Sequence, residues 1–476
     1  MSASIFWYDF ETTGIDPYSD RAIQVAGLRT NEQLEEVGEP LNIYCRLSDD
    51  ILPHPMSSLI TGIMPQTLQD QGLSEVEFIQ RLHEQMIVPQ TCSAGFNSLR
   101  FDDEMTRATL YRNFYDPYAR EWQGGNSRWD LIDVMRCTWA LRPDGINWPE
   151  HEGRVSFKLE RFTEANQIEH GQAHDALADV RATIAAARLL RDRQPKLFDY
   201  LYGLRRKDAL QARIRLMQPI LHVSGMFSVE RHCLAPVLPL AWHPTNRNAL
   251  IVYDLHADVT PLLECDAQTL KARLYTRHVD LPEGALPVAL KLIHINKSPV
   301  IAPLTVLRDE DTQRLAFDHE LLQRNYKLLS DRRSDWQDKL DQIYQETRAF
   351  AEQDIEQQLY NGFLGPRDRQ LCNKLRLAAP EQLQAEQWPF DDARLIELLF
   401  RYRARHYPQT LNREEQQQWT RFCRARLTGE QCGAPLTVPD YLTAYAELSE
   451  IEQAHPAVQA WRQYVQQLQQ RYQLPS

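Results

Sequence analysis

An apolar run near the start of the chain, Ile5-Phe6-Trp7-Tyr8, ends at two acidic residues, Asp9 and Glu11. The run predicts a buried strand, and side chains two residues apart on a strand project to the same side. Carboxylates on one face repel each other, and a divalent cation relieves that repulsion. Ligands collect at the carboxyl ends of strands in α/β sheets, so a metal site is one hypothesis, and ordinary surface charge is the other.

The first 195 residues are typical of an α/β domain. Three strand-like runs, Ser4–Phe10, Arg21–Thr30 and Leu41–Leu47, are joined by turn-rich segments and predict an antiparallel meander. Ser74 and Glu77 form a capping-box pattern at the start of an amphipathic helix. A further strand is expected at Thr91–Asn97.

Two more helices are expected in this domain, near Asp102–Phe114 and over Asp175–Arg193, the second ending just before Pro195. Asp102 opens one helix and is either a metal ligand or an N-cap. Asp179 lies in the first turns of the other, while His174 falls on the loop before it. Asp175 is a natural N-cap and also a rival of Asp179 for metal binding.

The chain of 476 residues is too long for one ordinary core, so two or three domains are expected. Short strand-like segments, Ile220–Phe227, Ala249–Tyr253 and Val288–Ile295, predict a small β-rich domain over residues 196–348. Residues 349–476 are rich in Gln, Glu, Leu and Arg with helical periodicity, which predicts a helical domain.

The net charge of −12 is unusual for a protein that binds nucleic acid. Residues 1–200 hold 31 acidic and 19 basic side chains, whereas the remainder holds 34 of each. A polyanion can still bind near the acidic part if divalent cations offset the carboxylates. Composition alone favours a small-molecule enzyme, and the motifs are needed to overrule it.

The chain shows no signal-peptide pattern and no apolar run near the roughly 18 residues of a spanning helix. Its eight cysteines are scattered without a C-x-x-C pair, which is typical of free thiols in a reducing compartment. We therefore expect a cytoplasmic protein that does not enter a membrane.

Taken in order, Asp9-x-Glu11, Asp102 and His174-x₄-Asp179 resemble the DEDDh exonuclease superfamily, which has a ribonuclease H-like fold. The resemblance implies that Asp9, Glu11, Asp102 and Asp179 hold two Mg²⁺ ions, with Mn²⁺ as a substitute. It assigns His174 as the base that takes the proton of the attacking water.

Longer strings extend this resemblance to the bacterial exonuclease I family over the whole chain. They include Arg100-Phe-Asp-Asp-Glu, Asn126-Ser-Arg-Trp-Asp, His222-Val-Ser-Gly-Met-Phe and Leu359-Tyr-Asn-Gly-Phe. The family joins a nuclease domain to an SH3-like β domain and a helical domain, which close a channel around single-stranded DNA. The resemblance implies a monomeric exodeoxyribonuclease of DNA repair and recombination that releases 5′-mononucleotides in the 3′→5′ direction.

Candidate DNA contacts follow from the same resemblance. One is Glu11, which is also a proposed metal ligand. The others are basic or aromatic side chains: Arg107, Tyr118, Trp122, Arg136, Lys158 and His222. Lys158 stands where the family has arginine, so it keeps the charge and lacks the bidentate fork. Core packing is the alternative for both aromatic residues. Arg401, Arg403 and Arg405 suggest either a nucleic-acid patch or a domain interface.

A partner is also implied, namely single-stranded-DNA-binding protein, whose acidic C-terminal tail ends in an apolar residue and a carboxylate. A receptor for such a tail needs an arginine beside an apolar or aromatic surface. Arg142, Tyr200 and Arg308 are the candidates, and three unrelated surface residues are the alternative. Rival functions are an exoribonuclease or general phosphodiesterase, and an inactive DNA-binding scaffold.

Overall fold

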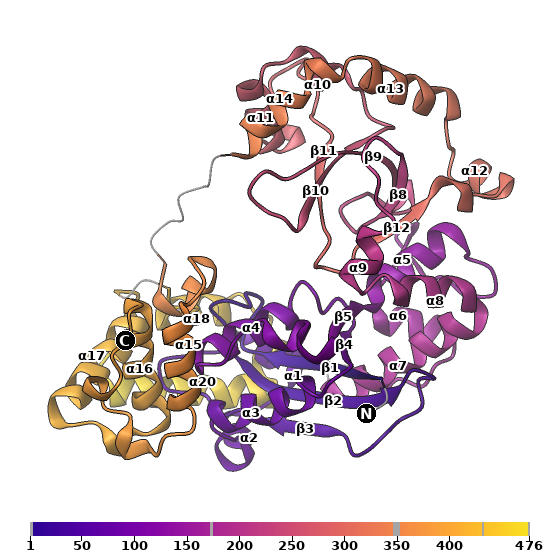
Figure 1. Ribbon diagram of the computed structural model, residues 1–476. Coiled ribbons are helices and arrows are strands. Elements are labelled where there is room, and N and C mark those ends of the chain that lie inside the picture. Colours follow the sequence, from indigo (N-terminus) through magenta and orange to yellow (C-terminus); the bar gives the residue numbers. More distant parts are fainter. Residues whose placement is uncertain (1–2, 172–174, 346–352, 431–432, 475–476) are drawn as a thin grey trace. The chain divides into compact units, whose positions relative to one another are not determined.

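The computed structural model describes residues 3–171, 175–345, 353–430 and 433–474 (Figure 1). The chain forms two compact units. The first comprises Met1–Ser127, His170–Ile184 and Phe350–Ser476, and the second comprises Arg128–Glu169 and Ala185–Ala349. The N-terminal α/β part and the C-terminal helices therefore share one unit. In the described part of the chain, no helix is long and apolar enough to cross a membrane.

The first unit is built on a sheet whose strand order includes β3-β2-β1-β4. Its strands are β1 (Ser4–Thr12), β2 (Ala22–Asn31), β3 (Leu41–Tyr44) and β4 (Thr91–Gly95). The first three pair antiparallel in sequence order, which confirms the predicted meander. Strand β4 lies parallel to β1. The chain leaves the unit within β5 (Ser127–Asp130).

Helices pack on this sheet because alternate side chains of β1 are aromatic. Phe6, Tyr8 and Phe10 share a buried cluster with Phe78 and Leu82 of α3. The predicted capping box is confirmed, since Ser74 and Glu77 cap the first turn of α3 reciprocally. The helices of this part are α1 (Pro55–Thr61), α2 (Pro65–Gln71), α3 (Glu75–Met86), α4 (Asp102–Arg112), η1 (Ala119–Glu121), η2 (Gln123–Gly125) and the start of α7 (Ala176–Arg193).

The C-terminal part of the first unit is helical, as expected. A buried cluster joins it to the N-terminal α/β part: Leu52 and Ile63 pack with Leu427, Tyr441 and Trp461. Its elements are η7 (Ile355–Tyr360), α15 (Pro366–Leu375), η8 (Pro380–Gln382), η9 (Ala385–Gln387), α16 (Ala393–His406), η10 (Pro408–Thr410), α17 (Arg413–Thr428), α18 (Val438–Ala446), α19 (Glu450–Gln453) and α20 (Pro456–Arg471).

The arginines of α16 are structural, so the nucleic-acid-patch alternative is wrong. Arg405 forms a 2.7 Å ion pair with Asp50 of the N-terminal α/β part, as the interface alternative predicts. Arg401 pairs with Asp354 at 2.8 Å, and Arg403 pairs with Glu415, both within the helical part. Of the three arginines, Arg405 therefore lies at an interface between two parts of the unit, and Arg401 and Arg403 contribute to packing within the helical part.

The second unit contains a five-stranded antiparallel sheet in the order β11-β10-β9-β8-β12. Its strands are β8 (Ile220–Val223), β9 (Leu234–Trp242), β10 (Ala249–Asp254), β11 (Leu290–His294) and β12 (Val300–Pro303). The β-rich expectation is confirmed, although β9 and β12 were not predicted. A short hairpin, β6 (Glu150–His151) with β7 (Arg154–Val155), lies outside this sheet.

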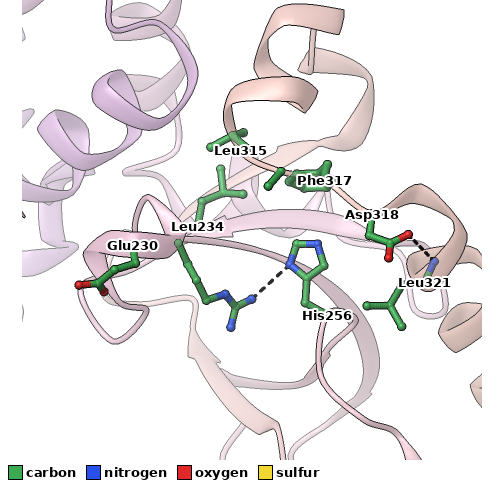
Figure 2. A pocket seen from close by; sticks show the side chains of 9 residues that line it. Glu230, Leu234, His256, Leu315, Phe317, Asp318 and Leu321 are labelled. Atoms are coloured by element: carbon green, nitrogen blue, oxygen red, sulfur yellow. Dashed lines mark hydrogen bonds between the residues drawn. The ribbon is translucent and has the colours of Figure 1, made fainter.

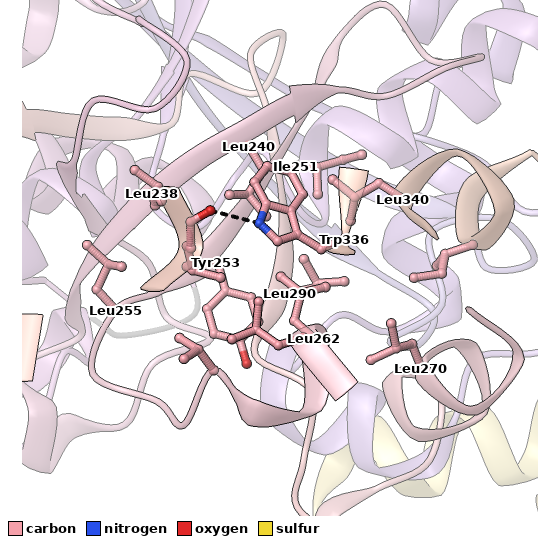
Figure 3. Close-up of a cluster of buried hydrophobic side chains, with 14 of the residues drawn as sticks. Leu238, Leu240, Ile251, Tyr253, Leu255, Leu262, Leu270, Leu290, Trp336 and Leu340 are labelled. Carbon is pink, nitrogen blue, oxygen red and sulfur yellow. Dashed lines mark hydrogen bonds between the residues drawn. The ribbon is translucent and has the colours of Figure 1, made fainter. Parts of the chain in front are cut away.

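Figure 3 shows the core on this sheet. Tyr253 and Ile251 of β10 pack with Leu340 and Trp336, and the indole of Trp336 donates a 2.9 Å hydrogen bond to the Leu329 carbonyl. The helices of the unit are α5 (Leu131–Leu141), α6 (Leu159–Ala165), the end of α7, α8 (Pro195–Gly203), α9 (Lys207–Gln211), η3 (Val229–Arg231), α10 (Thr260–Glu264), α11 (Ala267–Leu274), η4 (His278–Asp280), η5 (Leu304–Val306), α12 (Asp309–Arg314), α13 (His319–Asp331), η6 (Arg333–Asp335) and α14 (Gln337–Tyr344).

Candidate active site

Strand β1 carries Asp9 and Glu11 on the face opposite Phe6, Tyr8 and Phe10, because strand side chains alternate. Asp9 pairs with Ala26 of β2 and Glu11 with Gln24. The register shifts directly after Glu11, an irregularity of the kind that re-aims side chains beside active sites. Glu11 is buried, with 7% of its surface exposed.

Two helices bring further carboxylates to this strand end. Oxygen atoms of Asp9, Glu11 and Asp179 lie within 4.8 Å of one another, with Asp179 entering from the first turn of α7. Asp102 is the first residue of α4, so the N-cap alternative for it is wrong. Its Oδ1 instead accepts a 3.2 Å hydrogen bond from the amide of Phe10, between the two acidic residues of β1. The structure thus gathers all four predicted carboxylates around one strand end.

Crowding and burial disfavour the charged forms of Asp9 and Glu11. Burial, with the charges of Asp9, Asp179 and Asp175, raises the pKa of Glu11 to about 9. Burial, followed by Asp102 and Asp179, raises the pKa of Asp9 well above its usual value. A partly buried group of oxygen donors that repel one another is the donor set that hard divalent cations such as Mg²⁺ take.

A histidine that the sequence interpretation missed lies at this site. His170 Nε2 forms a 2.7 Å hydrogen bond with Asp179 Oδ1. His174 lies outside the described residues. Asp175, the rival for metal binding, is exposed and accepts hydrogen bonds from the amides of Leu177 and Ala178 at 3.0 and 3.4 Å, so its carboxylate caps α7 as expected.

Three family models match successive parts of the chain. The model described as Exonuclease matches residues 6–187, the Exonuclease I SH3-like domain matches residues 205–346, and the Exonuclease I C-terminal domain matches residues 353–468. Exodeoxyribonuclease I of Escherichia coli is 47% identical over 451 residues, which cover 94% of this chain and 92% of the relative. The chain belongs to the exonuclease I family.

Solved structures of exonuclease I share the fold over nearly the whole chain. E. coli exonuclease I in complex with a dA16 oligonucleotide is 44% identical, covers 98% of this chain and 100% of its own, and gives a TM-score of 0.93. The zinc-ion-bound form of the E. coli exonuclease I–ssDNA complex, also 44% identical, covers the same shares with a TM-score of 0.90. The expected fold class is therefore confirmed, while the exact boundaries at residues 195 and 348 stay predictions.

Besides Glu11, the first unit contains three candidate DNA contacts of this exonuclease I family member, and they differ in how accessible they are to a nucleic acid. The guanidinium of Arg107 is buried and pairs with Glu104 at 2.9 Å and Glu121 at 2.6 Å. It lies 5.4 Å from the ring centre of Tyr118, which is half-buried. Trp122 is 66% exposed, so core packing is wrong for this residue. Phe363, 85% exposed and 5.7 Å from the Tyr118 ring, is a neighbouring aromatic residue that was not predicted.

The candidates in the second unit also differ. Lys158 is exposed directly before α6, where a phosphate can reach it. Arg136 pairs with Asp133 at 2.6 Å. His222 is buried, its Nδ1 donates a 2.9 Å hydrogen bond to the Val300 carbonyl, and burial followed by the charge of Lys291 lowers its pKa to about 3. His222 is therefore neutral, and any DNA contact through it needs a change in its packing.

Of the three residues predicted to bind the partner tail, two share one acidic partner. Arg142 and Arg308 both bind the Asp311 carboxylate, each at 2.9 Å, and keep 26% and 39% of their side chains exposed. Tyr200 donates a 2.9 Å hydrogen bond to the carbonyl of Ile301. The two arginines thus form one basic site around a buried acid, which offsets part of their charge.

The β-rich unit also contains a cavity of about 330 Å³, shown in Figure 2. It is lined by Leu234, Phe317 and other apolar side chains, with Glu230, His256 and Asp318 among the polar ones. Asp318 caps α13 through the Leu321 amide at 2.9 Å, and Glu230 pairs with Arg154 at 2.8 Å. Both acidic residues are engaged within the fold, so we assign the cavity no part in catalysis.

Proposed function

We propose that this protein is a 3′→5′ exodeoxyribonuclease that hydrolyses single-stranded DNA to 5′-mononucleotides. The observation that carries the proposal is the convergence of the Asp9, Glu11 and Asp179 carboxylates within 4.8 Å, at the place where the family motif begins. The relatives named exodeoxyribonuclease I, and the oligonucleotide complex of one of them, support the choice of DNA.

We propose that the site holds two Mg²⁺ ions, which Mn²⁺ can replace. The ligands are Asp9, Glu11, Asp102 and Asp179. Their burial and mutual repulsion suit the binding of divalent cations. When bound, divalent ions at such a site activate water and stabilise the leaving oxygen of a phosphodiester. The zinc-bound structure of a relative supports a divalent ion in general and leaves its identity to experiment.

Three residues then have distinct roles in the proposed reaction. His174 takes the proton of the attacking water through a ring nitrogen, a role that rests on its motif position. Asp102 ties α4 to β1 through the Phe10 amide, which keeps its carboxylate beside Asp9. His170 holds Asp179 in one orientation, as hydrogen-bonded neighbours of metal ligands do.

For the DNA itself, we propose that Trp122 and Tyr118 stack on bases and that Lys158 and Arg136 contact phosphate. Arg107, already paired with two acids, acts by supporting the Tyr118 ring. Glu11 faces the scissile nucleotide as a metal ligand. His222 stays in this set on the strength of the resemblance alone.

We also propose that Arg142, Tyr200 and Arg308 receive the acidic tail of single-stranded-DNA-binding protein. The partly exposed guanidinium groups of Arg142 and Arg308 support this, because a tail carboxylate adds a further acceptor beside Asp311 and beside Glu310, which Arg308 also binds. Titration of a labelled tail peptide against Arg142→Ala and Arg308→Ala tests the site. Unchanged affinity in both variants, with full nuclease activity on naked DNA, would remove it.

The decisive experiment compares 3′- and 5′-labelled single-stranded DNA, blunt duplex DNA and single-stranded RNA, each with and without Mg²⁺ and Mn²⁺. We expect mononucleotides from the 3′ end of single-stranded DNA, only with metal, and slow loss of duplex. Faster RNA hydrolysis would support the exoribonuclease alternative, and no hydrolysis would support a scaffold. Size-exclusion chromatography with light scattering tests the monomer, and imaging of a tagged chain during DNA damage tests a cytoplasmic role in repair and recombination.

A further inference from the structure

We infer that η7 (Ile355–Tyr360), at the start of the C-terminal helical part, positions the two elements that carry Glu11 and Asp102, with Glu356 as the principal positioning residue. The inference rests on the metal site proposed above. It follows from contacts within the first unit, where one six-residue segment contacts both the loop after β1 and helix α4.

The first contact secures the loop after Glu11. The Glu356 carboxylate forms an ion pair with the guanidinium of Arg21, the residue before β2. Arg21 in turn closes the loop onto Thr13: the Thr13 amide donates to the Arg21 carbonyl at 2.9 Å, and the Arg21 amide donates to Thr13 Oγ1 at 2.9 Å. Thr13 lies two residues after Glu11. Through Arg21, Glu356 therefore anchors the end of the loop that connects β1 to β2.

A second contact secures the loop from the side. The ring of Tyr360 packs edge-on against Tyr18, which lies in the same loop, with the ring centres 6.1 Å apart. The loop between Glu11 and Arg21 is therefore held at two points by η7, one ionic and one aromatic.

The third contact reaches α4. The Tyr360 hydroxyl donates a hydrogen bond to Glu104, and Arg107 donates to the same hydroxyl oxygen at 3.0 Å. One turn further along, the Tyr111 hydroxyl donates to the Ile355 carbonyl at 3.2 Å. Because α4 begins at Asp102, these bonds fix the helix whose first residue is a proposed metal ligand.

Glu356 is suited to this role because it is buried and surrounded by arginines. It keeps 2% of its surface and lies within ion-pair distance of Arg21, Arg401, Arg405 and Arg426. It has no surface to offer a nucleic acid. Its replacement should therefore act on the metal site indirectly, through the elements it holds.

The test is Glu356→Gln, which keeps the shape of the side chain and removes the charge. The matched control is Glu415→Gln, which breaks a bidentate pair with Arg403 inside the helical part and leaves η7 intact. For each protein, Mg²⁺ affinity is measured by calorimetry without DNA, and kcat and KM are measured on single-stranded DNA. We expect Glu356→Gln to weaken Mg²⁺ affinity by roughly tenfold, as loss of outer support does elsewhere, and to lower kcat more than it raises KM.

The results separate three cases. Wild-type Mg²⁺ affinity and kcat in folded Glu356→Gln, or equal losses in Glu415→Gln, would overturn the positioning role and leave the proposed function standing. If the wild type itself bound no divalent ion, the metal site would fall, and the inference with it. If circular dichroism shows that Glu356→Gln is unfolded, Tyr360→Phe decides, because it removes only the hydroxyl that bonds Glu104; unchanged Mg²⁺ affinity there would overturn the inference.

Discussion

His170 Nε2 lies 2.7 Å from Asp179 Oδ1, so a histidine from outside the motif holds the carboxylate that the motif supplies. His170 and His174 both precede α7 in the sequence, and we propose different roles for them. The first orients a proposed metal ligand, and the second is the proposed base. Their replacement should give different kinetic signatures.

His174→Ala should lower kcat by ~10²–10⁴, the usual cost of losing a general base, and leave Mg²⁺ affinity unchanged. His170→Ala should instead weaken Mg²⁺ affinity by roughly 10–100-fold, because Asp179 loses the partner that fixes its oxygen atoms. Single-turnover rates at saturating and limiting Mg²⁺ measure both effects. The reverse pattern would mean that His170 is the base.

Asp9→Ala, Glu11→Ala and Asp179→Ala should each abolish hydrolysis, because each removes one of three oxygen donors that lie within 4.8 Å of one another. Binding of single-stranded DNA, measured by fluorescence anisotropy in EDTA, should largely survive. Asp175→Asn is the control, since its carboxylate caps α7, and this variant should be mildly affected. Activity within about tenfold of the wild type in any of the three alanine variants would contradict the two-metal assignment.

The metal-free protein should lose stability as pH rises above neutrality, because Glu11 has a raised pKa. Burial and neighbouring carboxylates raise the pKa of Glu11 from 4.5 to about 9, so between these values the folded state binds more protons than the unfolded state. The contribution is present at low pH and disappears as pH rises through the folded pKa. Buried His83, His222 and His406 have lowered pKa values, so they add stability as pH rises to about 6.5 and oppose this effect at lower pH. In EDTA, Tm should therefore fall as pH rises from about 7 to about 9, while the stabilisation by Mg²⁺ grows over the same interval.

Glu11→Gln is the control for this pH effect, because an amide does not titrate. Its Tm in EDTA should depend less on pH, and Mg²⁺ should stabilise it less at every pH. A wild-type protein whose Tm in EDTA is independent of pH over this range would show that the carboxylates are not crowded in solution.

Part of this architecture follows from local sequence and part does not. The antiparallel strands β1 to β3 and the Ser74 cap were predicted because alternation and capping are local patterns. Strand β9 was missed because it contains Pro236 and Pro239, residues that usually argue against a strand. A register shift where β10 pairs with β9 near Pro239 shows how the sheet accommodates one of them.

The site was predicted as far as the motif extends. Asp9, Glu11, Asp102 and Asp179 converge as the resemblance implies. His170 was not singled out, because a histidine nine residues before an aspartate matches no recognisable sequence motif or helical spacing. The pair formed by Arg21 and Glu356 joins positions 335 residues apart, and no local pattern predicts such a contact.

Arg405→Ala should destabilise the first unit by about 3–5 kcal/mol, the usual cost of leaving one member of a buried ion pair. Arg405 binds Asp50 at 2.7 Å, and both side chains are buried. Burial alone would raise the pKa of Asp50, but the charges of Arg405 and Arg426 outweigh it and lower that pKa to about 2. Urea denaturation at pH 7 measures the loss, with exposed Arg421→Ala as the control. Equal midpoints for the two variants would show that the pair contributes nothing.

Trp122 and Lys158 should contribute to DNA affinity in ways that salt separates. Loss of a phosphate contact lowers the salt dependence of single-strand binding, by roughly 0.7 in the slope of log K against log salt. Lys158→Ala should show this change, and exposed Lys196→Ala, which has no proposed contact, should not. Trp122→Ala should weaken binding by about 1–3 kcal/mol at every salt concentration with the slope unchanged, because stacking releases no counterions. Anisotropy titrations in EDTA from low to high salt measure the DNA affinity of all three variants. An equal salt-dependence slope in Lys158→Ala and the wild type would show that Lys158 does not contact the DNA.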